Sequence, residues 1–159
     1  MKKIRELLSK KTDRRSFFLD ESLVEYIEES STATDQIQRS LIEETSTLGW
    51  VSRMQISHDQ GSFLTMLVKA TQAQFAVEVG TFTGYSALAI ARGLPADAKL
   101  LCCDISEEWT DIARRHWREA EVDQKIDLVL APALETLDKL PLTQNIDFAF
   151  IDADKKNYI

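Results

Sequence analysis

The chain has 159 residues, of which 44% are apolar and 28% are charged, and its net charge is −7. This balance is typical of a globular protein with one domain, and it excludes collagen, a coiled coil and a wholly disordered chain. No stretch approaches the roughly 20 apolar residues that a membrane-spanning helix needs. Residues 1–15 carry a net charge of +5 and the rest of the chain −12, which disfavours binding to a phosphate backbone. We therefore expect neither nucleic acid nor a membrane as a partner.

The two cysteines, Cys102 and Cys103, are adjacent in the sequence. Adjacent cysteines rarely form a disulfide with each other, and two alone cannot complete a zinc site. We expect them to be buried thiols in a reducing compartment. Charged residues also interrupt any apolar leader near the start of the chain, so the cytoplasm is the expected location.

The N-terminal third is predicted to be helical. Helices are expected over residues 21–29 and 36–48. Ser57 and Gln60 then form a capping-box pattern. The apolar residues that follow recur at helical spacing: Phe63, Met66, Leu67 and Ala70. These signals predict a helix of about 12 residues after Ser57.

The rest of the chain alternates between strand and helix patterns. Apolar runs predict strands over residues 75–79, 99–103, 126–130 and 146–151. Apolar residues at helical spacing predict helices near 87–94, 109–120 and 134–140. Such an alternation predicts an α/β fold with a parallel sheet and helices on both faces. Ligands of these sheets bind at the carboxyl ends of the strands, and three of the four predicted ends carry acidic residues.

The turn after the first predicted strand has the sequence EVGTFTGYS over residues 78–86. Gly80 and Gly84 allow the backbone to approach a ligand closely. Phe82 stands where a dinucleotide-binding turn has its second glycine, which argues against a nicotinamide-dependent reductase. Asp104 ends the second strand, where a carboxylate can accept hydrogen bonds from two ribose hydroxyls or can cap the next helix. Together these features favour a nucleoside ligand that carries positive charge.

Segment 54–159 resembles the metal-dependent O-methyltransferases that include caffeoyl-CoA O-methyltransferase and catechol O-methyltransferase. The matching pieces are Met54-Gln55, residues 78–86, Asp104, residues 125–127, residues 132–134 and residues 151–158. The helices before them are similar in pattern only. We therefore expect one domain with two parts, an N-terminal helical segment (1–53) and a Rossmann-like domain that binds S-adenosylmethionine (54–159).

The resemblance implies S-adenosylmethionine as the methyl donor. The residues at matching positions that would bind it are Ile56, Glu78, Gly80, Thr81, Ser86, Asp104, Ala133 and Asp154. In this interpretation Asp104 holds the ribose and Ala133 borders the adenine. Asp154 reaches the methionine end, where its negative charge suits an amino group and a sulfonium.

The resemblance also implies that Asp152 and Lys155 carry the chemistry. Asp152 would bind a divalent cation, commonly magnesium, and Lys155 would lie beside the acceptor hydroxyl. A phenol titrates near pH 10, so a cation that stabilises the phenolate and an amine that accepts its proton would activate it. The predicted function is methyl transfer from S-adenosylmethionine to a small catechol-like or phenolic acceptor. Taken singly, Asp152 could instead cap the next element and Lys155 could be an ordinary surface residue.

Members of this family continue well beyond the position that matches Ile159. Three explanations are open: a fragment of a longer protein, a partner chain that completes the sheet, or a natural truncation that binds the donor weakly. We expect little or no methyl transfer from the 159 residues alone. The main alternative function is an inactive fragment that binds the donor or dimerises, and a NAD(P)-dependent reductase is a weaker one. Family members often form dimers, so a homodimer is expected.

Overall fold

The computed structural model describes residues 20–155, which fall into two compact units that divide between Ser31 and Thr32. The described part of the first unit is helix α2 (Glu21–Ser30). Its N-cap is Asp20, whose carboxylate accepts a hydrogen bond from the Leu23 amide at 2.9 Å. All other elements belong to the second unit. The boundary predicted between residues 53 and 54 stays a prediction.

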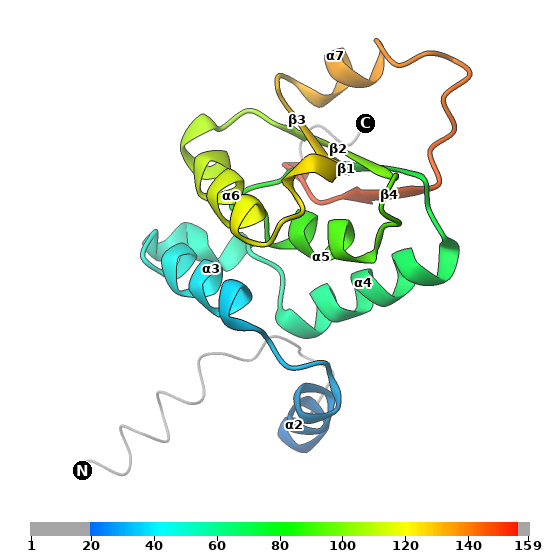
Figure 1. Ribbon diagram of the computed structural model, residues 1–159. Helices are drawn as coiled ribbons and strands as arrows, with labels where there is room; N and C mark the ends of the chain where they lie inside the picture. Colours follow the sequence, from blue (N-terminus) through cyan, green and yellow to red (C-terminus); the bar gives the residue numbers. More distant parts are fainter. Residues whose placement is uncertain (1–19, 156–159) are drawn as a thin grey trace, which may run out of the picture. The chain divides into compact units, whose positions relative to one another are not determined.

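The second unit is built on a four-stranded parallel sheet in the order β3-β2-β1-β4 (Figure 1). The strands are β1 (Phe75–Val79), β2 (Lys99–Asp104), β3 (Ile126–Leu130) and β4 (Phe148–Ile151). This confirms the predicted parallel α/β architecture. Val79 of β1 pairs with Cys103 of β2 and with Ile151 of β4. The loops that follow these strands therefore begin side by side, at the carboxyl edge of the sheet.

Helices cover both faces of the sheet, as the alternating pattern predicts. The helical elements are α3 (Gln36–Ser46), η1 (Gly49–Met54), α4 (His58–Thr71), α5 (Tyr85–Gly93), α6 (Glu107–Glu119), η2 (Asp123–Lys125) and α7 (Ala133–Leu137). Helices α4, α5 and α6 lie on one face and α7 on the other (Figure 1). Successive strand residues point to opposite faces. Ala76 and Leu100 therefore enter the main core under α5, whereas Val77 and Leu101 enter a smaller cluster under α7.

The capping box predicted at Ser57 and Gln60 is wrong. Ser57 does precede α4, but its hydroxyl makes no capping hydrogen bond. Burial raises the pKa of the neighbouring Asp59 carboxyl, yet hydrogen bonds from Ser57 and from backbone amides outweigh it and hold the pKa below its usual value. A capping box does occur at the start of α3, between Asp35 and Gln38.

Other predicted element boundaries also differ from the structure, three of them by two or three residues at one end. Helix α3 ends at Ser46 rather than near residue 48, and the chain soon reaches Gly49, whose φ of +69° is incompatible with a continuing helix. Strand β4 begins at residue 148 rather than 146. Asp147 lies just before it and accepts hydrogen bonds from the amides of Gln74 and Phe75. Helix α7 ends at residue 137 instead of 140. Within residues 20–155, no helix is long and apolar enough to cross a membrane.

Candidate functional site

The loop between β1 and α5, residues 80–84, packs closely against two other elements. A Cβ on Gly80 would lie 2.6 Å from the carbonyl oxygen of Asp152, which follows β4. A Cβ on Gly84 would lie 2.5 Å from the Cβ of Ala113 in α6. Both glycines have positive φ, +89° and +83°. Side chains are therefore excluded at both positions, sterically and by backbone conformation.

Asp104 fastens the β1–α5 loop to the end of β2. Its Oδ2 accepts hydrogen bonds from the amides of Thr81 and Phe82, both at 2.8 Å. Its Oδ1 accepts from the amides of Ile105 and Ser106, at 2.7 and 2.8 Å. The N-cap of α6 is Ser106. Asp104 thus organises two loops at the carboxyl edge, and its predicted bond to a ribose stays a prediction.

Phe82 holds a conformation that a bulky side chain rarely adopts, with φ at +51°. Such a residue is strained unless its surroundings fix it. Here its amide is bound by Asp104, and its ring packs edge-on against Trp109 with the ring centroids 5.0 Å apart. The structure therefore fixes the centre of the loop from both its backbone and its side chain.

Glu78 is a fully buried carboxyl one residue before the end of β1. The Cys102 thiol donates to its Oε2 at 3.5 Å, and its Oε1 has no hydrogen-bond partner among residues 20–155. Burial raises the pKa of Glu78 to about 7, and hydrogen bonding from Ser86 opposes this rise. Burial likewise raises the pKa of the Cys102 thiol. Glu78 therefore titrates near neutral pH rather than in acid.

Asp152 and Lys155, the residues that the resemblance implies carry the chemistry, lie together after β4. The Asp152 amide donates to the Val79 carbonyl at 2.9 Å, which holds this segment against the end of β1. The Lys155 Nζ lies 2.7 Å from Asp152 Oδ1, and both side chains are accessible to solvent. Asp154, between them, is also exposed. The arrangement presents a carboxylate and an amine on the same edge of the sheet as the β1–α5 loop.

The other predicted residues are less tightly grouped. Ser86 is buried in the first turn of α5, and Ala133 begins α7 and packs against the smaller cluster. Ile56 precedes α4 and packs against the main core. The sequence analysis missed Thr83 of the loop and Thr45 of α3, two buried residues whose hydroxyl oxygens are 2.9 Å apart. A threonine buried in a helix carries no sequence signal that names its partner.

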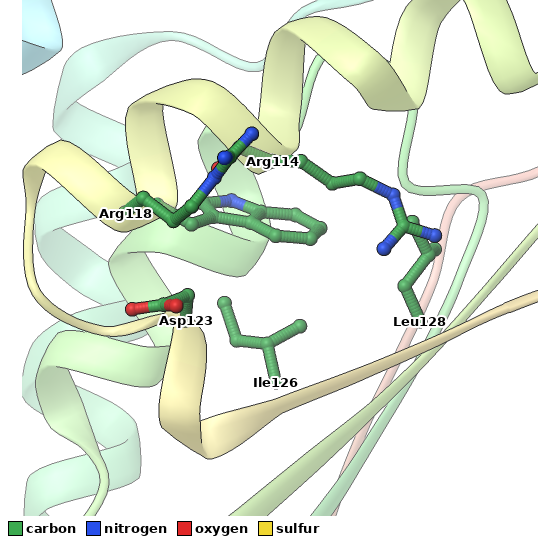
Figure 2. A pocket seen from close by; sticks show the side chains of 6 residues that line it. Arg114, Arg118, Asp123, Ile126 and Leu128 are labelled. Atoms are coloured by element: carbon green, nitrogen blue, oxygen red, sulfur yellow. The ribbon is translucent and has the colours of Figure 1, made fainter.

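A separate hollow of about 390 Å³ lies between α6, η2 and β3 (Figure 2). Its lining residues are Arg114, Trp117, Arg118, Asp123, Ile126 and Leu128. Figure 2 shows the Arg114 side chain extending toward Leu128, whereas the Arg118 side chain points away from Ile126. None of the predicted site residues lines this hollow, and Ile126 belongs to the amino end of β3. It is therefore not the site at the carboxyl edge.

Comparison with known families identifies the class. The model of the O-methyltransferase family matches residues 28–159, and the chain belongs to this family. Caffeoyl-CoA O-methyltransferase of Medicago sativa is 37% identical over 151 residues, which cover 91% of this chain and 61% of that protein. The chain thus spans about three fifths of the length of this relative.

Two similar solved structures contain a ligand. The O-methyltransferase of Bacillus cereus, solved in complex with SAH (S-adenosylhomocysteine), has a TM-score of 0.77 and 28% identity, over 86% of this chain and 62% of that one. The O-methyltransferase TomG of Streptomyces achromogenes, solved with SAM (S-adenosylmethionine), has a TM-score of 0.76 and 27% identity, over 84% and 60%. These values support a Rossmann-like methyltransferase fold for the parallel sheet.

Proposed function

We propose that the protein containing this chain transfers a methyl group from S-adenosylmethionine to a hydroxyl of a small catechol-like or phenolic acceptor. One observation carries the proposal. The β1–α5 loop, the carboxylate of Asp104 and the Asp152–Lys155 pair meet at one edge of a sheet whose solved relatives bind SAM or SAH. Ligands of parallel α/β sheets bind at this edge.

The acidic side chains and the positions of the predicted site residues support binding of a cationic nucleoside at this edge. Glycine at position 80 lets the loop pack directly against the backbone of Asp152 and Ala153, which brings the loop and the Asp152–Lys155 segment together. Thr81, Ser86 and Ala133 follow the strand ends, where they would line the donor pocket, with Ile56 contributing from the segment before α4. Asp104 would hold the ribose, and the exposed Asp154 would face the methionine end. Acidic groups favour a sulfonium and an amino group over a diphosphate.

The Lys155 amine would activate the acceptor. An acceptor hydroxyl beside Nζ gives up its proton to the neutral form of the amine, which becomes the ammonium, and the resulting oxygen attacks the methyl carbon of the donor. The oxygen–carbon bond forms as the carbon–sulfur bond breaks, so S-adenosylhomocysteine leaves with a neutral sulfur. Asp152, 2.7 Å from Nζ, holds the amine in place. Orientation of the two reactants by the sheet edge supplies much of the rate.

The described residues do not by themselves form a magnesium site. Residues 20–155 contain no group of three or more His, Cys, Asp or Glu side chains that could hold a metal. Asp152 supplies one carboxylate, and its Oδ1 already binds Lys155. Magnesium prefers six oxygen ligands, so assistance by a divalent cation stays a prediction for the whole protein and no step above depends on it.

Two alternatives remain in the proposal. An inactive fragment would bind S-adenosylhomocysteine without turnover, alone or as a homodimer. A NAD(P)-dependent reductase is disfavoured because the Phe82 side chain, packed on Trp109, fills the place of a glycine. A cytoplasmic location is part of the proposal, and the buried, unpaired thiols of Cys102 and Cys103 agree with a reducing compartment.

Calorimetric titration with S-adenosylhomocysteine, with NADH as the control ligand, separates these functions. We expect saturable binding of the first and none of the second. Methyl transfer to catechol is then measured with the 159-residue chain and with the native protein, whose intact mass shows whether it is longer. Donor binding with turnover only in a longer native protein supports the enzyme. Binding of NADH alone would overturn the proposal.

A further inference from the structure

Helix α3 and its cap are tied to the surrounding elements by polar contacts. The contacts are Asp35–Arg92 at 2.6 Å, Gln38–Tyr85 at 3.2 Å, Glu44–Arg115 at 2.6 Å and Thr45–Thr83 at 2.9 Å. The first three reach helices α5 and α6. Thr45 instead reaches the β1–α5 loop itself, and it forms the contact in which both residues are buried. Thr45 is therefore placed to control the loop.

The hydroxyl pair is shielded from water. Thr45 is 1% exposed and Thr83 0% exposed, and the Thr45 hydroxyl donates to Thr83 Oγ1. A buried hydroxyl that loses its partner has no water to replace it, so the full desolvation cost of the unsatisfied group lowers stability. Thr45 also lies on the same helix face as the fully buried Leu41, which anchors this face in the main core.

The loop needs such a tie because its backbone is strained. Thr83 lies between Phe82 and Gly84, which both have positive φ. Asp104 holds the amides of Thr81 and Phe82 from the β2 side. Thr45 holds the next residue from the α3 side. The loop is thus fastened between two elements distant in sequence, and releasing either one frees it to leave the strained conformation.

We infer that Thr45 is a positioning residue for donor binding: its hydroxyl holds Thr83 and thereby keeps the β1–α5 loop in the shape that receives the donor. The identity of the ligand rests on the proposed function, but the effect on the loop does not. Helix α3, which lies outside the donor-binding edge, would then influence how tightly that edge binds the donor.

The effect on the loop can be measured without ligand, by amide hydrogen exchange in Thr45→Val, which keeps the side-chain shape, and Thr45→Ser, which keeps the hydroxyl. We expect exchange of the Thr81 and Phe82 amides to be about tenfold faster in the valine variant and to return to the wild-type rate in the serine variant. The Leu101 amide in β2 reports global opening. Equal acceleration of the loop and β2, or no acceleration of the loop, would overturn the inference.

Two further variants separate the loop effect from helix docking. Glu44→Gln weakens the link between α3 and Arg115, one residue away from Thr45, and should leave exchange in the loop unchanged. Thr83→Val removes the same hydrogen bond from the other side. If Thr45→Val does not fold, the pair Thr83→Val and Thr83→Ser answers the same question. A loop loosened equally by Glu44→Gln would contradict a specific role for Thr45.

Binding completes the experiment. In calorimetry with S-adenosylhomocysteine, Thr45→Val should bind about five- to tenfold more weakly, while Thr45→Ser and Glu44→Gln bind like the wild type. A looser loop with unchanged binding would overturn the positioning role. If the wild-type chain does not bind S-adenosylhomocysteine, the proposed function fails, and the exchange rates alone then decide whether Thr45 holds the loop.

Discussion

Gly80 and Asp152 are far apart in the sequence, yet a Cβ on Gly80 would lie 2.6 Å from the Asp152 carbonyl oxygen. The contact joins the β1–α5 loop to the segment that carries Lys155. The two halves of the proposed chemistry, donor binding and acceptor activation, are therefore held together through backbone rather than through flexible side chains. Any side chain at position 80 must separate them.

Gly80→Ala is expected to abolish detectable S-adenosylhomocysteine binding and to lower thermal stability. The left-handed φ alone costs an alanine roughly 1–2 kcal/mol, and here backbone atoms of Asp152 and Ala153 must also move. Gly49→Ala is the matched control, because Gly49 has φ +69° but a Cβ at this position would meet nothing within 4 Å. Denaturant unfolding should show a clearly larger loss for Gly80→Ala. Equal losses for the two variants would contradict the close approach.

Glu78 should make stability fall as pH rises through the mildly acidic range. Its pKa is about 7 in the folded chain and 4.5 as the ordinary value, so between these values the folded state holds a proton that the unfolded state has released. The stabilisation is complete below about pH 4.5 and lost as pH rises to about 7. At about 1.4 kcal/mol per unit it amounts to about 3 kcal/mol.

Glu78→Gln isolates this contribution. Asp147 and Glu44 have lowered pKa values, through backbone amides and through Arg115 respectively, and they change stability in acid in both proteins. Subtracting the two unfolding free energies removes their effect. Urea unfolding from about pH 4.5 to about pH 8 should show the variant gaining on the wild type up to about pH 7 and then levelling off. A difference that does not depend on pH would show that Glu78 keeps an ordinary pKa.

Asp104→Ala is expected to destabilise the chain by about 2–3 kcal/mol, because four backbone amides lose a charged acceptor. Asp127→Ala serves as the control. Asp127 is also an acid on a neighbouring strand, but it is exposed and lies 3.9 Å from its partner Lys99, so its removal should change little. Denaturant midpoints of the two variants give the comparison. A cost for Asp104→Ala as small as that for Asp127→Ala would mean that the loop is held elsewhere.

The sequence predicted the positions of the strands better than the contacts that join the strands to neighbouring elements. Strands β1 and β3 match the predicted ranges because short, largely apolar runs bounded by turns mark strands locally, although each run contains one acid, Glu78 or Asp127. Strand β4 was predicted two residues too early because Ile146 is apolar, while Asp147 is directed to the amides of β1 by a contact that no local pattern contains.

Some features of the candidate site could likewise be predicted from the sequence, and others could not. Glycines and acids at strand ends are visible in the sequence, so the meeting of the β1–α5 loop, Asp104 and Asp152 at one edge could be predicted from strand order alone. The burial of Glu78 and the bond between Thr45 and Thr83 depend on how α3 and α5 pack over the sheet. Such packing joins residues far apart in the sequence, and secondary-structure propensities carry no information about these contacts.

Lys155→Met is expected to lower kcat about a hundredfold in the native protein that contains this chain, because it removes the group that accepts the acceptor proton. The affinity for S-adenosylhomocysteine should stay unchanged, since the amine lies beside Asp152 and not in the β1–α5 loop. Lys155→Arg should not restore activity, because a guanidinium holds its proton too firmly to act as a base. Lys139→Met, a change at another exposed lysine, is the control. Radiolabelled methyl transfer and calorimetry supply the two measurements, and a loss of donor binding together with turnover would assign Lys155 to the donor pocket instead.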